Sequence, residues 1–208
     1  MKQIRVFGVV MVCVGVLAGF FLSGCSGIVR DFPETRLFVI ETPELNEAVA
    51  AFETGKGLLI RQFDISAEFE SSFFVYKVSD NRFTSDYYNK FMVSPGRMIS
   101  DVVQDVLDST VFFRRVPVSE PDRIDFRLSG KITELYVDTQ SPEHPRAVMA
   151  LRLLLEKQTP VGFMPVINQV YRAEEPASRR PADEFVRAWN RCLERVVRQF
   201  LADVDLLI

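Results

Sequence analysis

A cysteine at the end of an apolar N-terminal segment is the residue whose surroundings most clearly predict a chemical modification. Residues 22–25 read Leu-Ser-Gly-Cys and close an apolar run over residues 6–22, and Lys2 and Arg5 precede that run. A basic start, an apolar stretch and small residues at its end are the three parts of a secretory signal. We therefore expect cleavage at the small residues before Cys25. The alternative is a retained membrane span, but roughly 17 residues fall short of the ~20 that a helix needs.

The segment around Cys25 resembles the signal of bacterial lipoproteins. That resemblance implies a diacylglyceryl group and an N-acyl group on the cysteine, and stable anchoring requires more than one chain because each buried methylene contributes only ~0.8 kcal/mol. Ser26 follows, where an Asp would be the usual signal for retention at the inner membrane. The resemblance thus implies the periplasmic face of the outer membrane of a Gram-negative bacterium. Residues up to Thr35 then form a tether that reaches at most ~35 Å.

Composition limits the remaining possibilities. We expect a signal peptide at residues 1–24, a tether at 25–35 and one periplasmic domain at 36–208, a length that can bury a sizeable core. The chain has a net charge of −3, without the basic excess that nucleic-acid binding requires. Its 3 cysteines leave Cys25 and Cys192 after processing, so the fold must stand without an internal disulfide in an oxidising compartment.

Residues suited to catalysis are scarce. His144 is the 1 histidine of the chain, and its place in a loop between Glu143 and Pro145 favours an exposed turn residue. Zinc needs three or four ligands at characteristic spacings, which do not occur, so we expect no metal and no cofactor. Cys192 lies on an apolar helix stripe, which favours a buried, inert thiol. Lys56 between two glycines is only a fragment of a phosphate loop. A glycosidase-like carboxylate pair stays open, without support from spacing.

Aromatic side chains are concentrated between residues 73 and 91. Such residues either fill the core or form an interface or acyl-chain contact, and both interpretations remain open. The candidates for contact with a partner or with lipid are Phe73, Tyr76, Tyr87, Tyr88, Asn89 and Phe91. Tyrosines bury apolar area while keeping a polar end, as residues at interface cores do.

Periodicity predicts the elements that must position these residues. Strands are expected at 36–41 (an edge or a starter strand), 58–65, 73–78, 81–86, 112–118, from 124 on, 147–156 and 166–171, with a helical or irregular piece at 44–53. Residues 73–78 and 81–86 can form a hairpin. A change of alternation predicts a bulge near Thr133. Residues 147–156 are apolar on nearly both faces, which is typical of a central strand.

Two amphipathic helices complete the pattern. Ser94 followed by Pro95 is a good helix start, with the Ser side chain as cap. Pro181 opens a long helix with an apolar stripe of period near 3.6. Its polar face carries several Arg residues, interpreted as a solvated face because Glu194 and Arg198 have pairing distance, with a basic recognition face as the alternative. The predicted fold is α+β: a mostly antiparallel sheet covered by two main helices.

Four segments together resemble the ABC-type transport auxiliary lipoproteins, a family similar to the paraquat-inducible C-type lipoproteins that accompany mammalian-cell-entry (MCE) domain proteins. They are residues 61–67 (RQFDISA), 73–77 (FFVYK), 85–95 (SDYYNKFMVSP) and 111–116 (VFFRRV). The resemblance covers residues 36–200, is strongest over 58–116 and contains no catalytic signature.

This resemblance implies a non-enzymatic component of envelope lipid transport with a fold similar to the TolB N-terminal domain. Its expected partners are an MCE-domain protein, the inner-membrane ABC transporter behind it, phospholipid and further copies of the chain. The alternatives are a lipoprotein that only scaffolds an envelope complex and, further behind, a periplasmic hydrolase.

Overall fold

The fold is known from a computed structural model that describes residues 34–41, 56–110, 112–178 and 181–207. Within the chain, Glu34–Ile208 forms one compact unit. The expected signal peptide, Cys25 and the piece at residues 44–53 lie outside the described residues.

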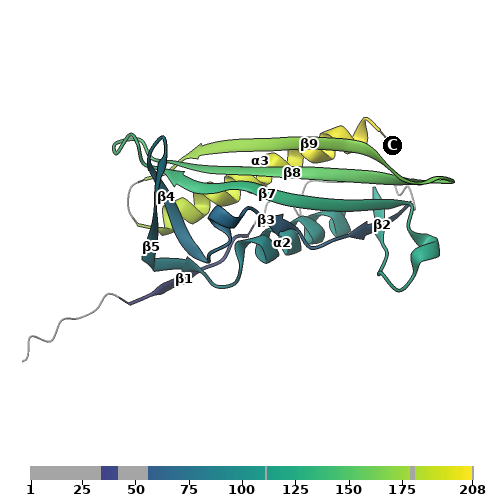
Figure 1. The fold of residues 1–208 in the computed structure, drawn as a ribbon, viewed down its shortest axis with the longest axis horizontal. Coiled ribbons are helices and arrows are strands. Elements are labelled where there is room, and N and C mark those ends of the chain that lie inside the picture. The colour runs from purple at the N-terminus through teal and green to yellow at the C-terminus, as the bar shows by residue number, and fades with distance from the viewer. Residues whose placement is uncertain (1–33, 42–55, 111, 179–180, 208) are drawn as a thin grey trace, which may run out of the picture. The chain divides into compact units, whose positions relative to one another are not determined.

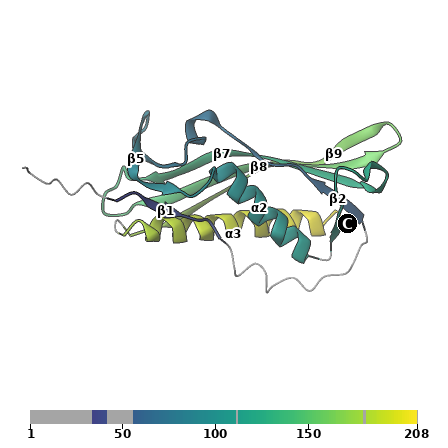
Figure 2. The same ribbon diagram turned by 90° about the horizontal axis from the view of Figure 1, so that it is seen from below.

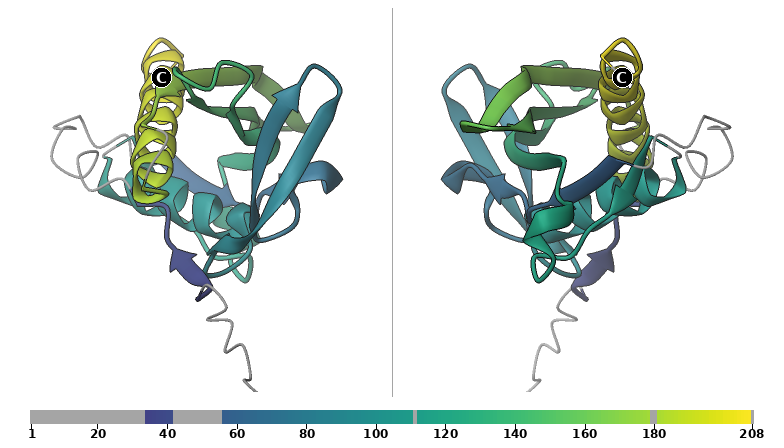
Figure 3. Two further views of the ribbon diagram at one scale, coloured as in Figure 1. Left: turned by 90° about the vertical axis from the view of Figure 1, so that its left-hand side faces the viewer. Right: turned by 90° about the vertical axis from the view of Figure 1, so that its right-hand side faces the viewer.

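The described residues of this unit form one sheet and two helices (Figure 1). The strands are β1 (Arg36–Phe38), β2 (Lys56–Ile60), β3 (Asp64–Ile65), β4 (Phe73–Ser79), β5 (Arg82–Phe91), β6 (Phe113–Arg115), β7 (Phe126–Asp138), β8 (Arg146–Thr159) and β9 (Gly162–Pro176). The helices are α2 (Pro95–Ser109) and α3 (Asp183–Asp205), with short 3₁₀ turns η2 (Ala67–Phe69) and η3 (Pro121–Arg123). Figure 2 shows both helices on one side of β7, β8 and β9, and Figure 3 shows the same arrangement along the strands.

The sheet is mixed: its long ladders are antiparallel, as the sequence predicts, and short parallel pairings join them. Its long strands pair antiparallel, β7 with β8, β8 with β9, and β4 with β5. The short strands add parallel pairings, β1 with β5, β2 with β6, and β2, β3 and β4 with β7. The α+β class and the two covering helices are confirmed. Alternation of side chains reports burial and carries no information about strand direction, so the parallel pairs were not predictable from it.

Strand β8 occupies the central position that its composition predicts, between β7 and β9. The register of β7 against β8 shifts between Ile132 and Glu134, which confirms the bulge expected near Thr133. The expected single strand at 58–65 is wrong, because β2 ends at Ile60 and β3 begins at Asp64. In the break, buried Phe63 packs where Gly130 leaves room: a Cβ on Gly130 would lie 2.8 Å from its ring.

Helix α2 begins where its sequence signal predicts, with Pro95 in the first turn. The capping interaction differs from the expectation. The Ser94 side chain makes no cap hydrogen bond to any described residue, and the amides of Arg97 and Met98 instead donate to the Ser94 carbonyl. Proline alone is thus the effective start signal.

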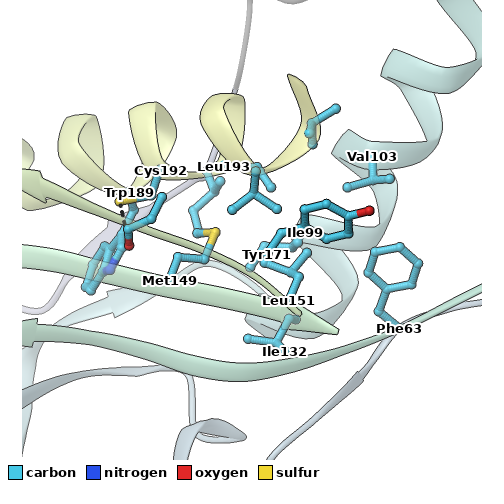
Figure 4. Close-up of a cluster of buried hydrophobic side chains, with 14 of the residues drawn as sticks. Phe63, Ile99, Val103, Ile132, Met149, Leu151, Tyr171, Trp189, Cys192 and Leu193 are labelled. Carbon is cyan, nitrogen blue, oxygen red and sulfur yellow. Dashed lines mark hydrogen bonds between the residues drawn. The ribbon is translucent and has the colours of Figure 1, made fainter. Parts of the chain in front are cut away.

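The core lies between α3 and the sheet (Figure 4). Trp189, Cys192 and Leu193 from the apolar stripe of α3 are all 0 % exposed, as are Met149 and Leu151 from β8. Burial raises the pKa of the Cys192 thiol to about 12, and the expectation of a buried thiol is confirmed. A helix that buries one whole stripe obtains most of its stability from this packing.

Gly57 in β2 provides a direct test of the packing at the end of the sheet where β2, β6 and β7 begin. A Cβ at this position would lie 1.8 Å from the Arg123 carbonyl oxygen, whereas one on Gly96 in α2 has its nearest neighbour at 3.4 Å. Overpacking costs about 1–3 kcal/mol, so we expect Gly57→Ala to lower the melting temperature by about 2–12 °C. Gly96→Ala is the control and should melt at the wild-type temperature or up to about 4 °C above it, because alanine is the better helix former and fits there. Equal melting of the two variants would contradict this account of Gly57.

Candidate functional site

A bulge in β5 displays the two tyrosines singled out by the sequence. The β4–β5 register pairs Phe73 with Lys90 but Phe74 with Asp86. Residues 87–89 therefore face no β4 residue and project from the ladder, the effect of a multi-residue bulge on the longer strand. We call residues 87–89 the tyrosine bulge.

Asp86 holds this bulge in shape through both carboxylate oxygens. Oδ1 accepts hydrogen bonds from the backbone amides of Tyr88 (2.9 Å) and Asn89 (3.2 Å). Oδ2 accepts from the Tyr76 hydroxyl (2.8 Å) and from Asn89 Nδ2 (2.6 Å). Asp side chains commonly satisfy amides two and three residues ahead in this way. The network replaces the strand pairing that the bulge gives up.

The charge state of this cluster follows from its contacts. Burial by itself would raise the pKa of Asp86, but hydrogen bonds from Asn89, the Tyr88 amide and Tyr76 outweigh it and hold the pKa below the ordinary value of 3.8. Burial and the neighbouring Asp86 raise the pKa of Tyr76. At neutral pH the carboxylate is thus an anion that accepts only, and the phenol is a donor.

The structure divides the expected contact residues into exposed and buried ones. Tyr87 is 74 % exposed and Tyr88 45 % exposed, whereas Asn89 is 8 % and Phe91 2 % exposed. The Phe91 ring lies 5.4 Å from that of Trp189, so the expectation of surface contact is wrong for Phe91 and Asn89. Asn89 Oδ1 is buried without a partner among the described residues.

Two further candidates, Tyr76 and Phe73 on β4, contact residues of the bulge or its neighbour Asp86. Tyr76 is half-buried and committed to Asp86. Phe73 is half-buried, with its ring centre 5.8 Å from that of Tyr87 and 5.9 Å from Lys90 Nζ. Both residues therefore position the exposed tyrosines and offer little surface themselves.

An apolar surface continues from the tyrosine bulge onto β1. Strand β1 runs parallel to β5, with Arg36 opposite Asn89 and Phe38 opposite Phe91. Exposed apolar side chains follow along both segments: Leu37, Val39, Tyr87, Tyr88, Met92 and Val93. We call these six residues the β1–β5 surface. The sequence indicated only its tyrosines, because the pairing of β1 with β5 joins segments about 50 residues apart.

A second apolar surface lies at the turn between β8 and β9, which the sequence interpretation missed. Residues 160–166 read Pro-Val-Gly-Phe-Met-Pro-Val without a charge. Val161 is 88 % and Met164 51 % exposed, while Phe163 carries the Arg127 guanidinium at 4.3 Å. We call residues 160–166 the hairpin tip. A Pro-Val-Gly sequence between two apolar strands was the signal that could have located it.

The two apolar surfaces lie at opposite ends of the sheet (Figures 1 and 2). Tyr76 beside the bulge pairs with Val137, which pairs with Ala147 near the start of β8. The hairpin tip follows Thr159 at the other end of that strand. A strand rises about 3.3 Å per residue, so roughly 40 Å separate Ala147 from Thr159.

The Arg-rich face of α3 is neutralised by carboxylates. Arg198 pairs with Glu194 as the spacing predicts, and Arg191 and Arg195 pair with Glu175, which is 8 % exposed on β9. These residues line a shallow pocket. Because its cations are already paired, the solvated-face interpretation is favoured over a recognition face.

Groups suited to catalysis or metal binding are not brought together in the described part of the chain. His144 is exposed in a turn, as expected. Among the described residues, no group of three His, Cys, Asp or Glu side chains could hold a metal ion. Within the same ranges no helix is long and apolar enough to cross a membrane.

Solved structures share this fold. No protein-family model matches the sequence, and no curated protein matches it. Protein XCC0632 from Xanthomonas campestris, described as a member of family DUF330, has a TM-score of 0.63 at 14 % identity, with 81 % of this chain and 91 % of that chain covered. A crystal structure of an uncharacterized protein gives 0.60 at 15 % identity, covering 84 % and 100 %. Hypothetical protein CT253 from Chlamydia trachomatis gives 0.54 at 8 % identity, covering 73 % and 98 %. At these identities the likeness defines a shared fold.

The Asp86 network makes a prediction with a distinctive pH dependence. Asp86→Ala leaves the Tyr76 hydroxyl and buried Asn89 unsatisfied, which costs about 2–3 kcal/mol. Because the folded-state pKa of Asp86 is lowered, its contribution is fully present above pH ~4 and is lost as pH falls through the folded pKa. The gap in melting temperature between wild type and variant should therefore be about 5–10 °C at pH 7 and shrink below pH ~4. Asp105→Ala, exposed on α2, is the control. A gap that persists unchanged at pH 3 would contradict the assignment.

Proposed function

We propose that this protein is an outer-membrane lipoprotein that serves as the periplasmic auxiliary component of an ABC transport system moving lipid between the two membranes. In this role it docks an MCE-domain protein. The four segments that resemble the ABC-type transport auxiliary lipoproteins support the proposal, and a fold shared with a DUF330 protein is compatible with it. The lipid anchor at Cys25 and the outer-membrane location are parts of the same proposal.

One observation carries the proposal on the structural side: the two exposed apolar surfaces lie at opposite ends of one rigid sheet. A tethered docking component needs one end near its membrane and another end free for its partner. The described chain begins beside the tyrosine bulge, because β1 is parallel to β5 and Arg36 lies opposite Asn89. The hairpin tip then faces away from the point where the tether joins the domain.

The hairpin tip has the chemistry of a protein contact. Methionine and aromatic side chains are enriched in interface cores, and charged residues are depleted there. The tip combines exposed Val161 and Met164 with Phe163, and its two prolines reduce the entropy lost on binding. We therefore assign the MCE contact to the hairpin tip.

A scaffold that never handles lipid is the second candidate. It would use the same anchor and tip, so the discriminating observation is phospholipid that co-purifies with the domain. A variant of this protein that abolishes lipid transport while the envelope complex still assembles would favour the transport role.

The first prediction of this proposal concerns the anchor. Cys25→Ala should leave an unprocessed precursor that incorporates no radioactive palmitate, because the thiol that receives the lipid is missing. Cys192→Ala is the matched control and should label normally. Undiminished labelling of Cys25→Ala would remove the anchor from the proposal.

The second prediction concerns the partner. Val161→Asp combined with Met164→Ser should reduce capture of the MCE protein encoded next to this chain by at least tenfold, because a charge would be desolvated at an apolar contact. Both side chains are exposed, so the melting temperature should change by less than about 2 °C. Tyr87→Ser, at the other end of the sheet, should leave capture unchanged.

The same pull-down tests the proposed function and the proposed contact site separately. Failure of the wild-type protein to retain the MCE protein would contradict the function itself. Capture that survives the tip substitutions and disappears with Tyr87→Ser would instead assign the partner to the tyrosine bulge.

A further inference from the structure

The β1–β5 surface is unusual in its composition for an exposed region. Leu37 is 51 %, Met92 58 % and Val93 44 % exposed, and they lie on β1 and just beyond the end of β5, the strand that carries Tyr87 at 74 %. Single exposed apolar residues are ordinary, but several on two paired segments indicate an interaction site. The segment that leads from Cys25 into β1 indicates what binds at this surface.

The tether meets the domain directly beside the tyrosines. Since β1 is parallel to β5 with Arg36 opposite Asn89, the preceding residues Glu34 and Thr35 run toward the level of Tyr87 and Tyr88. Cys25 lies nine residues before Glu34, a distance of at most ~35 Å. A lipid attached to that cysteine would keep this end of the sheet within reach of a bilayer at all times. Such a link supplies a high effective concentration, so even a weak direct contact would be populated.

We propose that the β1–β5 surface rests on the bilayer that holds the acyl chains of Cys25. The inference rests on the lipid anchor of the proposed function. Tyr87 and Tyr88 lie at the headgroup level, where amphipathic rings are favoured, and Leu37, Met92 and Val93 face the acyl boundary. Lys90, which lies opposite Leu37 in the β1–β5 pairing, and Arg36 supply cations for lipid phosphates.

The stiffness of the tyrosine bulge suits this role. Asp86 fixes the Tyr88 and Asn89 amides, and Phe73 supports the Tyr87 ring. The tyrosines are therefore already projecting before contact, which removes part of the ordering cost. With this end on the membrane, the hairpin tip about 40 Å along the sheet points into the periplasm.

Fluorescent labels at two ends of the sheet test the proposal. The lipidated protein is reconstituted into vesicles of phosphatidylethanolamine and phosphatidylglycerol, with an NBD probe on Leu37→Cys or Tyr88→Cys, and with Val161→Cys at the hairpin tip as control. Cys192 is 0 % exposed, and the Cys25 thiol is occupied by lipid, so each variant carries one reactive thiol. We expect a blue shift and at least twofold stronger quenching by spin-labelled lipid at positions 37 and 88 than at position 161.

Two results would overturn the inference while leaving the anchor intact. One is protein that floats with the vesicles and shows equal quenching at all three positions. The other is a probe response at positions 37 and 88 that arises only when the MCE protein is added, which would make the surface a protein contact. Protein that fails to float with vesicles would overturn the anchor together with the inference, so the two failures are distinguishable.

Discussion

The packing of Trp189 against the two strands of the bulge is the interaction on which the rest of the structure depends. Its indole lies 4.9 Å from the Phe74 ring and 5.4 Å from the Phe91 ring, and its Nε1 donates to the Tyr136 carbonyl. One side chain of α3 thus joins β4, β5 and β7. Phe74 and Phe91 stand on either side of the extra residues of β5, so the same contact that builds the core holds both ends of the bulge.

The Asp86 carboxylate adds the hydrogen bonds that the aromatic packing does not provide. With its flanks fixed, the bulge must satisfy the amides that lack ladder partners, and a single carboxylate does this for Tyr88 and Asn89. The half-buried position strengthens these hydrogen bonds and makes their loss costly. Rigid display of Tyr87 and Tyr88 therefore follows from core packing on one side and a local polar network on the other.

Local patterns predicted much of the fold and little of the site. The helix that begins at Pro95, the stripe of α3 and the bulge near Thr133 were all visible in the sequence, because each depends on neighbours a few residues apart. Strand direction was not, since β1 and β2 pair in parallel with strands far along the chain. The tyrosines were identified as contact candidates by type, but only the register shows why Tyr87 is exposed while Phe91 is buried.

Because the two apolar surfaces lie at opposite ends of one sheet, the orientation of the domain matters for any mechanism in which it is tethered. A tether alone leaves the domain free to rotate, so the hairpin tip would face the periplasm only part of the time. A second contact beside the tether would remove most of that freedom, because the continuous β7, β8 and β9 ladders transmit the orientation of one end to the other. The entropy lost on partner binding then becomes smaller, since the tip is presented in one direction before the partner arrives. In the proposed mechanism, a membrane contact at the β1–β5 surface would thus fix the direction in which the hairpin tip meets the partner.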